Sequence, residues 1–175
     1  MKNNIRFKLR RFRKGDAPSL LKNINDKAIY CYTLDIPYPY TIQIARKWVN
    51  LNLEAYRKKK KKMMNFVIDI NGEVAGSVGL TAIYNTHKKA ELGYWLAKKY
   101  WGKGIMTQAV GQTLEYGFVK LGLNRIFAFT RVENIASQKV LQKNNFQLEG
   151  LLRKNIIKDG KPKDLYLFAI LKKDI

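Results

Sequence analysis

Residues 90 to 107 read Ala-Glu-Leu-Gly-Tyr-Trp-Leu-Ala-Lys-Lys-Tyr-Trp-Gly-Lys-Gly-Ile-Met-Thr, an apolar strand that runs into a glycine-spaced turn opening a helix. Gly102 and Gly104 lack Cβ atoms, so the backbone there can turn tightly and approach a ligand closely. Free N–H groups at the start of the next helix, with the positive end of its dipole, favour a pyrophosphate. The stretch predicts a phosphate cradle, although a Gly-x-Gly pair alone also fits a plain strand-to-helix turn.

The residues before this stretch predict a strand, two helices and a hairpin. Residues 5–10 alternate apolar with basic, which is the period of a half-buried strand, and residues 16–31 have a helical pattern. Thr41 is placed to cap a second helix, whose apolar residues recur at helical spacing: Ile44, Trp48, Leu51 and Ala55. Asn71-Gly72 suits a two-residue turn between strands over 66–70 and 73–80.

The residues after it alternate between strands and helices. A helix is predicted from Ile105 to Leu121 and ends at Gly122, and a short helix follows the capping residue Asn134. Strands are predicted over three segments: 126–130, 147–157 and 165–171. This order predicts one α/β domain over residues 1–175, built on a mixed sheet.

The composition limits the chemistry and the location. The chain has one histidine, His87, and one cysteine, Cys31, so a zinc site of the Cys/His kind cannot form within it, and we expect no metal. Apolar runs are too short to span a bilayer, and residues 1–14 lack the apolar stretch of a secretory signal. The sequence therefore predicts a cytoplasmic protein with no membrane partner.

The charge is strongly positive. Lys and Arg number 34 against 13 Asp and Glu, which gives a formal net charge of +21. Such a field attracts polyanions, so ribosome or RNA association is a candidate property. The densest run, Lys58 to Lys62, follows a predicted helix and is either a solvated helix cap or a binding patch.

Three linked stretches resemble the GNAT acetyltransferase superfamily, and within it the RimJ/RimL branch that acetylates ribosomal-protein N-termini. They are Glu91 to Leu96, Trp101 to Thr107, and Arg131 to Ser137 continuing through Lys143 to Phe146 and Leu148 to Gly150. Ile36-Pro37-Tyr38-Pro39-Tyr40 ahead of a helix is also typical of this branch. The resemblance implies a mostly antiparallel mixed sheet that is splayed at its centre, with flanking helices.

The resemblance also implies where acetyl-CoA binds as co-substrate, namely where strand 90–97 splays from strand 125–131. The pantetheine arm would pair with backbone groups of Leu96 and Ala97. The pyrophosphate would lie on the amides of six consecutive residues, to which one lysine adds charge: Gly102, Lys103, Gly104, Ile105, Met106 and Thr107. Trp101 and Met106 depart from the superfamily's usual Gln or Arg and small residue, and match the forms seen in the RimJ/RimL branch.

Five positions are candidates for proton chemistry or for contacts with the coenzyme arm. By resemblance Asn134 and Ser137 face that arm, with Ser137 as the acid for the leaving thiolate, while both also suit plain helix capping. Glu91 is the first candidate for the base, because Ile156 stands where the branch can carry a glutamate; an ion pair with a nearby cation is its structural alternative. Asp164, Tyr166 or a water relay are held in reserve.

The resulting prediction is an N-acetyltransferase in which a primary amine attacks the thioester directly, without a covalent enzyme intermediate. The preferred acceptor is a protein N-terminal α-amine. A polyamine or aminoglycoside acceptor is the first alternative, which the net charge disfavours; a non-catalytic RNA-binding, ribosome-binding or coenzyme-sensing module is the second. The sequence leaves the acceptor and a choice between monomer and homodimer open.

Overall fold

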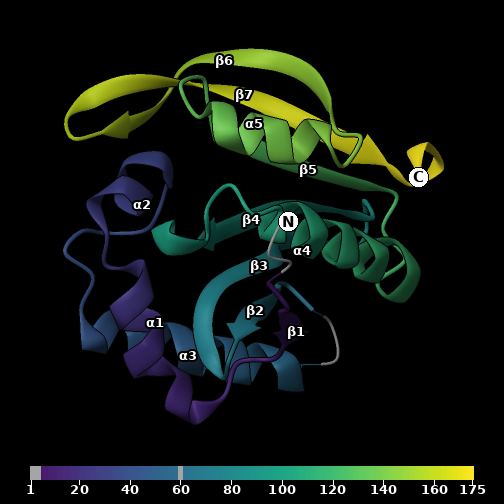
Figure 1. The fold of residues 1–175 in the computed structure, drawn as a ribbon. Helices are drawn as coiled ribbons and strands as arrows, with labels where there is room; N and C mark the ends of the chain where they lie inside the picture. Colours follow the sequence, from purple (N-terminus) through teal and green to yellow (C-terminus); the bar gives the residue numbers. More distant parts are fainter. Residues whose placement is uncertain (1–4, 59–60) are drawn as a thin grey trace.

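The computed structural model describes residues 5–58 and 61–175, in which one seven-stranded sheet carries helices on both faces (Figure 1). The strands are β1 (Lys8–Arg10), β2 (Met64–Ile70), β3 (Glu73–Tyr84), β4 (Lys89–Leu96), β5 (Arg125–Arg131), β6 (Gln147–Lys158) and β7 (Lys161–Leu171). The helices are α1 (Ala17–Ile24), α2 (Lys27–Tyr32), α3 (Ile42–Arg57), α4 (Ile105–Glu115) and α5 (Ile135–Gln142).

The strand order is β1-β2-β3-β4-β5-β7-β6, and only the β4–β5 pair is parallel. The prediction of a mixed, mostly antiparallel sheet with flanking helices is therefore confirmed. Asn71 and Gly72 turn the β2–β3 hairpin with φ angles of 55° and 84°, the positive values that a two-residue turn of this kind needs.

Alternate residues of β4 pack on two different helical layers. Leu92 and Leu96 belong to the apolar cluster that contains α4, whereas Trp95 packs in a second cluster with α1 and α3. Because successive side chains of a strand point to opposite faces, Glu91 and Gly93 lie on the α1/α3 face and Tyr94 on the α4 face. This alternation decides on which face of the sheet each candidate functional residue of β4 lies.

The predicted helix over 16–31 is wrong as a single element, because α1 ends at Ile24 and α2 begins at Lys27. The Asp26 side chain accepts a hydrogen bond from the Ala28 amide and so starts α2. The Asn25 side chain accepts from the amide of Tyr40, 15 residues further on. Side-chain oxygens that bind backbone N–H groups thus replace continued helix at this point.

Helix α3 begins where Thr41 caps it, as predicted. Its predicted apolar face is right in part, because Ala55 is buried and Ile44 and Trp48 are partly buried against the core. Its buried residues are Ala45, Val49, Asn52 and Ala55, while Leu51 is exposed. Asn52 is fully buried because it accepts from the Asn65 side chain (3.0 Å) and donates to the Trp48 carbonyl (2.9 Å). A satisfied polar residue in the core is invisible to a search for apolar periodicity.

The basic run behind α3 is described only in part, since Lys59 and Lys60 lie outside the described residues. Lys61 Nζ donates to the carbonyls of Ala55 (3.3 Å) and Tyr56 (2.6 Å) at the end of α3, which supports the helix-cap interpretation for this residue. Lys58 and Lys62 are exposed. No helix within residues 5–58 and 61–175 is long and apolar enough to cross a membrane.

A buried ion cluster joins β1 to the rest of the sheet. Arg10 binds Asp16 through two bonds of 2.8 Å and Asp69 through Nε, with each of the three side chains less than a tenth exposed. Burial alone would raise the pKa of Asp69, but Arg10 and the Gly72 amide hold it below its usual value. Asp69 therefore stabilises the fold above pH 4 or so, and this contribution is lost as the pH falls through its lowered pKa.

We expect Arg10→Met to lower the free energy of unfolding by about 3–5 kcal/mol, because it leaves two carboxylates buried without their cation. Denaturant titration at neutral pH measures the loss. Arg125→Met is the matched control, since Arg125 pairs with Glu149 at a site where both side chains are about a third exposed; its effect should stay within about 1 kcal/mol. Equal effects of the two variants would contradict the importance of burial here.

Candidate active site

The sheet opens between β4 and β5. These strands pair only from Lys89 to Glu91 and from Arg125 to Phe127, after which β5 continues along β7 alone. Figure 1 shows β5, β6, β7 and α5 together above β4, with β1 to β3, α1 and α3 below it. The splay that the sequence motifs predicted is therefore present, and it begins at Glu91.

The glycine-spaced turn lies at the start of α4, beyond the end of β4. Gly102 and Gly104 have φ angles of +73° and +75°, and a Cβ built on either would meet no atom within 4 Å. None of the described residues accepts a hydrogen bond from the amides of residues 102–107, whereas the next amide, that of Gln108, bonds to the Gly104 carbonyl (3.2 Å). Gly102, Lys103 and Gly104 are exposed, whereas Ile105 and Met106 are buried. Six backbone donors without a partner in the described chain, at the start of a helix, suit a phosphorylated ligand.

Leu96 and Ala97, predicted to pair with the pantetheine arm, already use part of their backbone. The Ala97 amide donates to the Ala75 carbonyl on β3 (2.8 Å), and the Leu96 carbonyl accepts from the Trp101 indole (2.6 Å). The alternation of antiparallel hydrogen bonds then points the Leu96 N–H away from β3, toward the splay. The indole bond also gives Trp101 a structural role that fixes the turn before Gly102.

Asn134 and Ser137 lie at the start of α5, on the other side of the splay. The Asn134 Oδ1 atom accepts from the Ser137 amide (3.1 Å), so the predicted helix cap is confirmed. The Asn134 Nδ2 group makes no hydrogen bond within the described part of the chain, so it is available to a ligand. Capping and ligand contact are therefore compatible at this residue.

Tyr94 is a site residue that the sequence argument missed. Its phenol oxygen lies 2.8 Å from Ser137 Oγ and 3.3 Å from the Ser137 carbonyl oxygen, so it ties β4 to α5 across the splay. Burial raises the pKa of Tyr94 well above its usual value, although the Ser137 bond opposes this. The alternation of side chains along β4 places Tyr94 on the same face as Leu92 and Leu96, so its face could be predicted from the sequence. Its partner Ser137 could not, because it lies 43 residues further along the chain.

Glu91 lies at the point where the β4–β5 pairing ends, on the face opposite Tyr94. It is partly buried, and no described residue forms an ion pair or hydrogen bond with its carboxylate, so the cation-pair alternative has no support there. Burial raises the pKa of Glu91, and the negative charge of Asp35 raises it further. A carboxylate with a raised pKa is a better proton acceptor near neutral pH.

The reserve candidates for a base are less suited. Asp164 accepts from the Lys154 amide (2.7 Å) and so supports a bulge in β6, where Lys154 has a φ angle of 50°. Tyr166 pairs with Thr130 and stacks edge-on against Phe168. Ile156 pairs with Lys163 near the end of the β6–β7 hairpin.

Helix α2 closes the side of the splay that faces Glu91. Tyr30 donates a hydrogen bond to Asp159 at the β6–β7 turn. Lys158 Nζ donates to the Thr33 carbonyl (3.1 Å) and lies 3.7 Å from the Tyr30 ring centre. Arg131 at the end of β5 donates to the Cys31 carbonyl. Figure 1 accordingly shows α2 below the tip of this hairpin. The segment that follows α2 is thereby held beside the opening.

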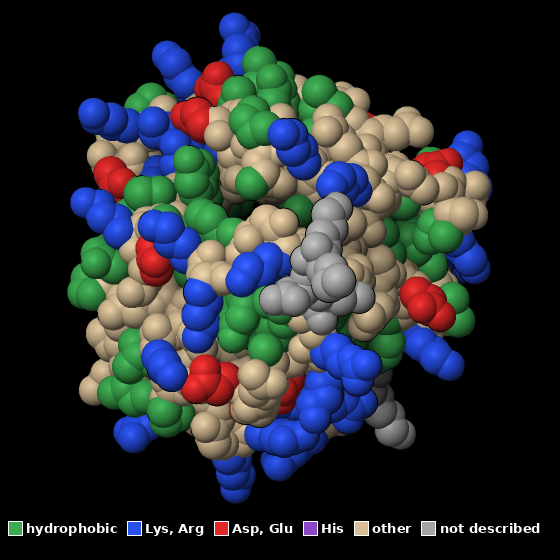
Figure 2. All heavy atoms as spheres, in the orientation of Figure 1, with side chains coloured by type: hydrophobic (Ala, Val, Ile, Leu, Met, Phe, Trp, Pro, Cys, Tyr) green, Lys and Arg blue, Asp and Glu red, His purple; other side chains and the backbone are tan. Residues whose placement is uncertain are grey.

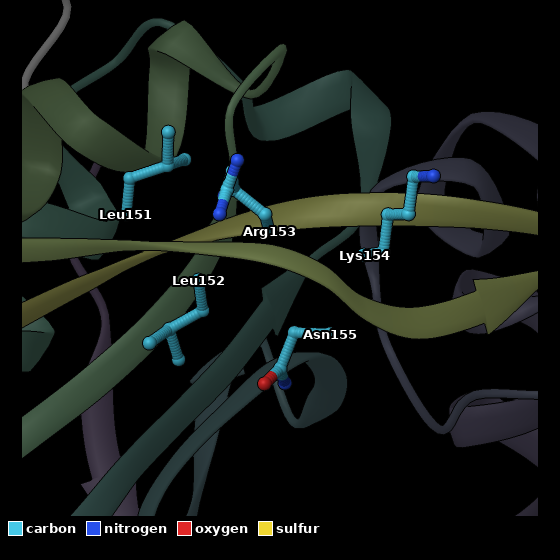
Figure 3. A pocket seen from close by; sticks show the side chains of 5 residues that line it. All are labelled: Leu151, Leu152, Arg153, Lys154 and Asn155. Atoms are coloured by element: carbon cyan, nitrogen blue, oxygen red, sulfur yellow. The ribbon is translucent and has the colours of Figure 1, made fainter.

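A hollow of about 590 Å³ lies elsewhere, along the edge strand β6. Leu152 and Asn155 project from one side of this strand, and Leu151 and Arg153 from the other (Figure 3). The hollow borders the bulge at Lys154 and not the turn at Gly102. Within the described ranges no group of three or more His, Cys, Asp or Glu residues is placed to hold a metal ion.

Comparisons with known proteins define the class. The model of the acetyltransferase (GNAT) domain matches residues 6–147, so the chain belongs to the GNAT acetyltransferase family, whose members are acetyl-CoA-dependent acetyltransferases. The uncharacterized N-acetyltransferase p20 of Bacillus licheniformis is 32% identical over 169 residues, which cover 97% of this chain and 94% of that protein. The family and the enzyme class predicted from the three motifs are confirmed.

Two further likenesses concern the branch and the acceptor. The structure of RimL, a ribosomal L7/L12 α-N-protein acetyltransferase in complex with coenzyme A, is 28% identical with a TM-score of 0.86, covering 94% of this chain and 93% of that one. The spermidine N(1)-acetyltransferase of Escherichia coli K12 is 26% identical over 155 residues, covering 87% and 79%. The chain thus falls in the branch that contains ribosomal-protein acetyltransferases, and its relatives include enzymes for both kinds of acceptor.

Proposed function

We propose that this chain transfers the acetyl group of acetyl-CoA to the α-amine of a protein N-terminus. The observation that carries the proposal is the likeness to RimL, which extends over nearly the whole of both chains. The net charge of +21 supports the same acceptor class, because it repels free polycations and attracts a peptide presented on an anionic polymer such as ribosomal RNA.

The residues proposed to bind the coenzyme form two groups. The amides of residues 102–107 hold the pyrophosphate, with Lys103 adding a positive charge. The Leu96 N–H, the Asn134 Nδ2 group and Ser137 contact the pantetheine arm as it crosses the splay. Acetyl-CoA itself supplies an activated thioester, and the chain's contribution is to orient that group and to manage the protons.

Glu91 is proposed as the base. Glu91 lies on the α1/α3 face, whereas Ser137 contacts Tyr94 on the α4 face. The amine therefore approaches from one face of the sheet while the sulfur departs toward the other. The Glu91 carboxylate takes the proton that the amine releases when the N–C bond forms, and Ser137 faces the sulfur that leaves with the C–S electron pair. No side chain need form a covalent intermediate.

A second acceptor class has one observation in its favour. Asp35 adds to the negative potential at Glu91, which raises the pKa of that carboxylate and would also attract a cationic amine. A polyamine acceptor is therefore the alternative, and the likeness to spermidine N(1)-acetyltransferase agrees with it. The two classes share the coenzyme site and differ only in what enters beside α2.

Charge and chain length also suggest the partners, location and domain organisation of the protein. Lys and Arg side chains are scattered over the face drawn in Figure 2 and gather at its lower edge. With the net charge of +21, such a surface suits association with the ribosome or RNA. We further propose that residues 1–175 act as one acetyltransferase domain in the cytoplasm, without a metal, as a monomer or a homodimer.

Transfer of isotopically labelled acetyl into a cell lysate tests the acceptor. We expect label on one or a few protein N-termini when tryptic peptides and small molecules are measured separately by mass spectrometry. Label confined to a small amine would replace the proposal with the polyamine alternative. No label above a reaction without enzyme, despite tight coenzyme binding, would instead indicate a coenzyme sensor.

A further inference from the structure

The hydrogen bond between Tyr94 and Ser137 is the only side-chain bond among the described residues that joins β4 to α5. Tyr94 stands three residues beyond Glu91, where the β4–β5 pairing has already ended. Ser137 is in the first turn of α5, where its amide is held by Asn134. The phenol therefore reaches the one hydroxyl group that the proposed mechanism places beside the leaving sulfur.

We propose that Tyr94 is a positioning residue that donates a hydrogen bond to Ser137 Oγ and so directs the serine's own hydroxyl hydrogen toward the sulfur of acetyl-CoA. This inference rests on the proposed function of Ser137 and adds a residue to it. A phenol is a stronger acid than an aliphatic alcohol, so the phenol is the donor in such a pair. The contact with Oγ, at 2.8 Å, is also shorter than the 3.3 Å contact with the Ser137 carbonyl.

Tyr94 does not supply the proton itself. Because burial raises the pKa of its phenol, it remains protonated, and its loss of a proton to a thiolate is strongly unfavourable. During transfer the N–C bond forms, the C–S bond breaks with its electron pair on sulfur, and the amine proton goes to Glu91. The Ser137 hydroxyl donates a hydrogen bond to the new thiolate, and Tyr94 keeps that hydroxyl from rotating away.

The proposal predicts that Tyr94→Phe weakens binding of the coenzyme A thiolate more than binding of the acetyl-CoA thioester. We expect binding of free coenzyme A, measured by calorimetry above the thiol's usual pKa of about 8.5, to weaken about tenfold, as for loss of a hydrogen bond to a charged atom. Binding of acetyl-CoA should change less than about twofold, because a thioester sulfur is a weak acceptor. This readout needs no acceptor, so it stands even if the acceptor assignment fails.

Catalysis gives a second readout. Tyr94→Phe should lower kcat about tenfold with little change in KM for acetyl-CoA, and Ser137→Ala should cause a similar loss. The double variant should lose no more than the single ones, because both residues act on the same atom. Tyr116→Phe is the matched control: Tyr116 is a partly buried tyrosine of the same apolar cluster, and its hydroxyl has no partner among the described residues.

Three outcomes would overturn the proposal. Unchanged thiolate binding in Tyr94→Phe would show that the phenol does not act on the sulfur. Equal weakening of coenzyme A and acetyl-CoA would indicate a purely structural role. Fully additive losses in the double variant would mean that Tyr94 and Ser137 act independently.

Discussion

Gly104→Asp should abolish measurable acetyl-CoA binding. The residue starts α4 at the centre of the six free amides, and its added carboxylate would stand against the phosphates. Two like charges about 4 Å apart repel by about 4 kcal/mol at an effective dielectric constant of 20, which corresponds to about a thousandfold in Kd. Calorimetric titration with acetyl-CoA measures the loss directly.

The control for this prediction is Gly122→Asp. Gly122 also has a positive φ angle, +64°, and open space where a Cβ would be, so both substitutions introduce the same charge and a similar backbone strain. Gly122 ends the helical segment that follows α4 and lies outside the cradle. Gly122→Asp should bind acetyl-CoA like the wild type. Loss of binding in both variants, or retained binding in Gly104→Asp, would contradict the assignment of residues 102–107 as the phosphate cradle.

Glu91→Gln should lower kcat by about 10² to 10⁴-fold while the Kd for acetyl-CoA stays nearly constant. In the wild type, kcat should fall as the pH drops through the pKa of Glu91. Burial and the nearby charge of Asp35 raise this pKa above its usual value, so the loss should begin at a higher pH than for an ordinary glutamate. That acid limb should be absent in the variant. Glu115→Gln, an exposed carboxylate of α4, is the matched control and should keep the wild-type profile.

Glu91→Gln should leave the stability of the fold unchanged or raise it, although it lowers kcat. A carboxyl group whose pKa is higher folded than unfolded binds protons more tightly in the folded state, so its contribution to stability falls as the pH rises through that interval. At neutral pH Glu91→Gln should therefore unfold at the same or a higher temperature than the wild type. A lower melting temperature with unchanged kcat would assign Glu91 to the fold instead of to catalysis.

The parts of the molecule that the sequence predicted well depend on neighbouring residues. The Asn71-Gly72 turn, the Thr41 cap and the tight turn at Gly102 and Gly104 all follow from residues a few positions apart. The family motifs add the splay, because they carry information about tertiary structure that no local pattern holds. Together these features place the proposed coenzyme site.

The parts that the sequence did not predict depend on distant partners. The break between α1 and α2 needs Asn25 to bind the Tyr40 amide, and the buried face of α3 needs Asn52 to meet Asn65. The Tyr94–Ser137 bond similarly joins two elements separated by a helix and a strand. Polar pairs of this kind leave no periodic signal in a single sequence.

Titration of the glycine amide resonances with acetyl-CoA is the most direct check of the site. The chain has 12 glycines, so a protein labelled with ¹⁵N only at glycine gives a short and assignable set of signals. We expect Gly102 and Gly104 to shift most, while Gly122 and Gly160 stay in place. Binding that leaves Gly102 and Gly104 unmoved would contradict the assignment of the turn before α4 as the phosphate cradle.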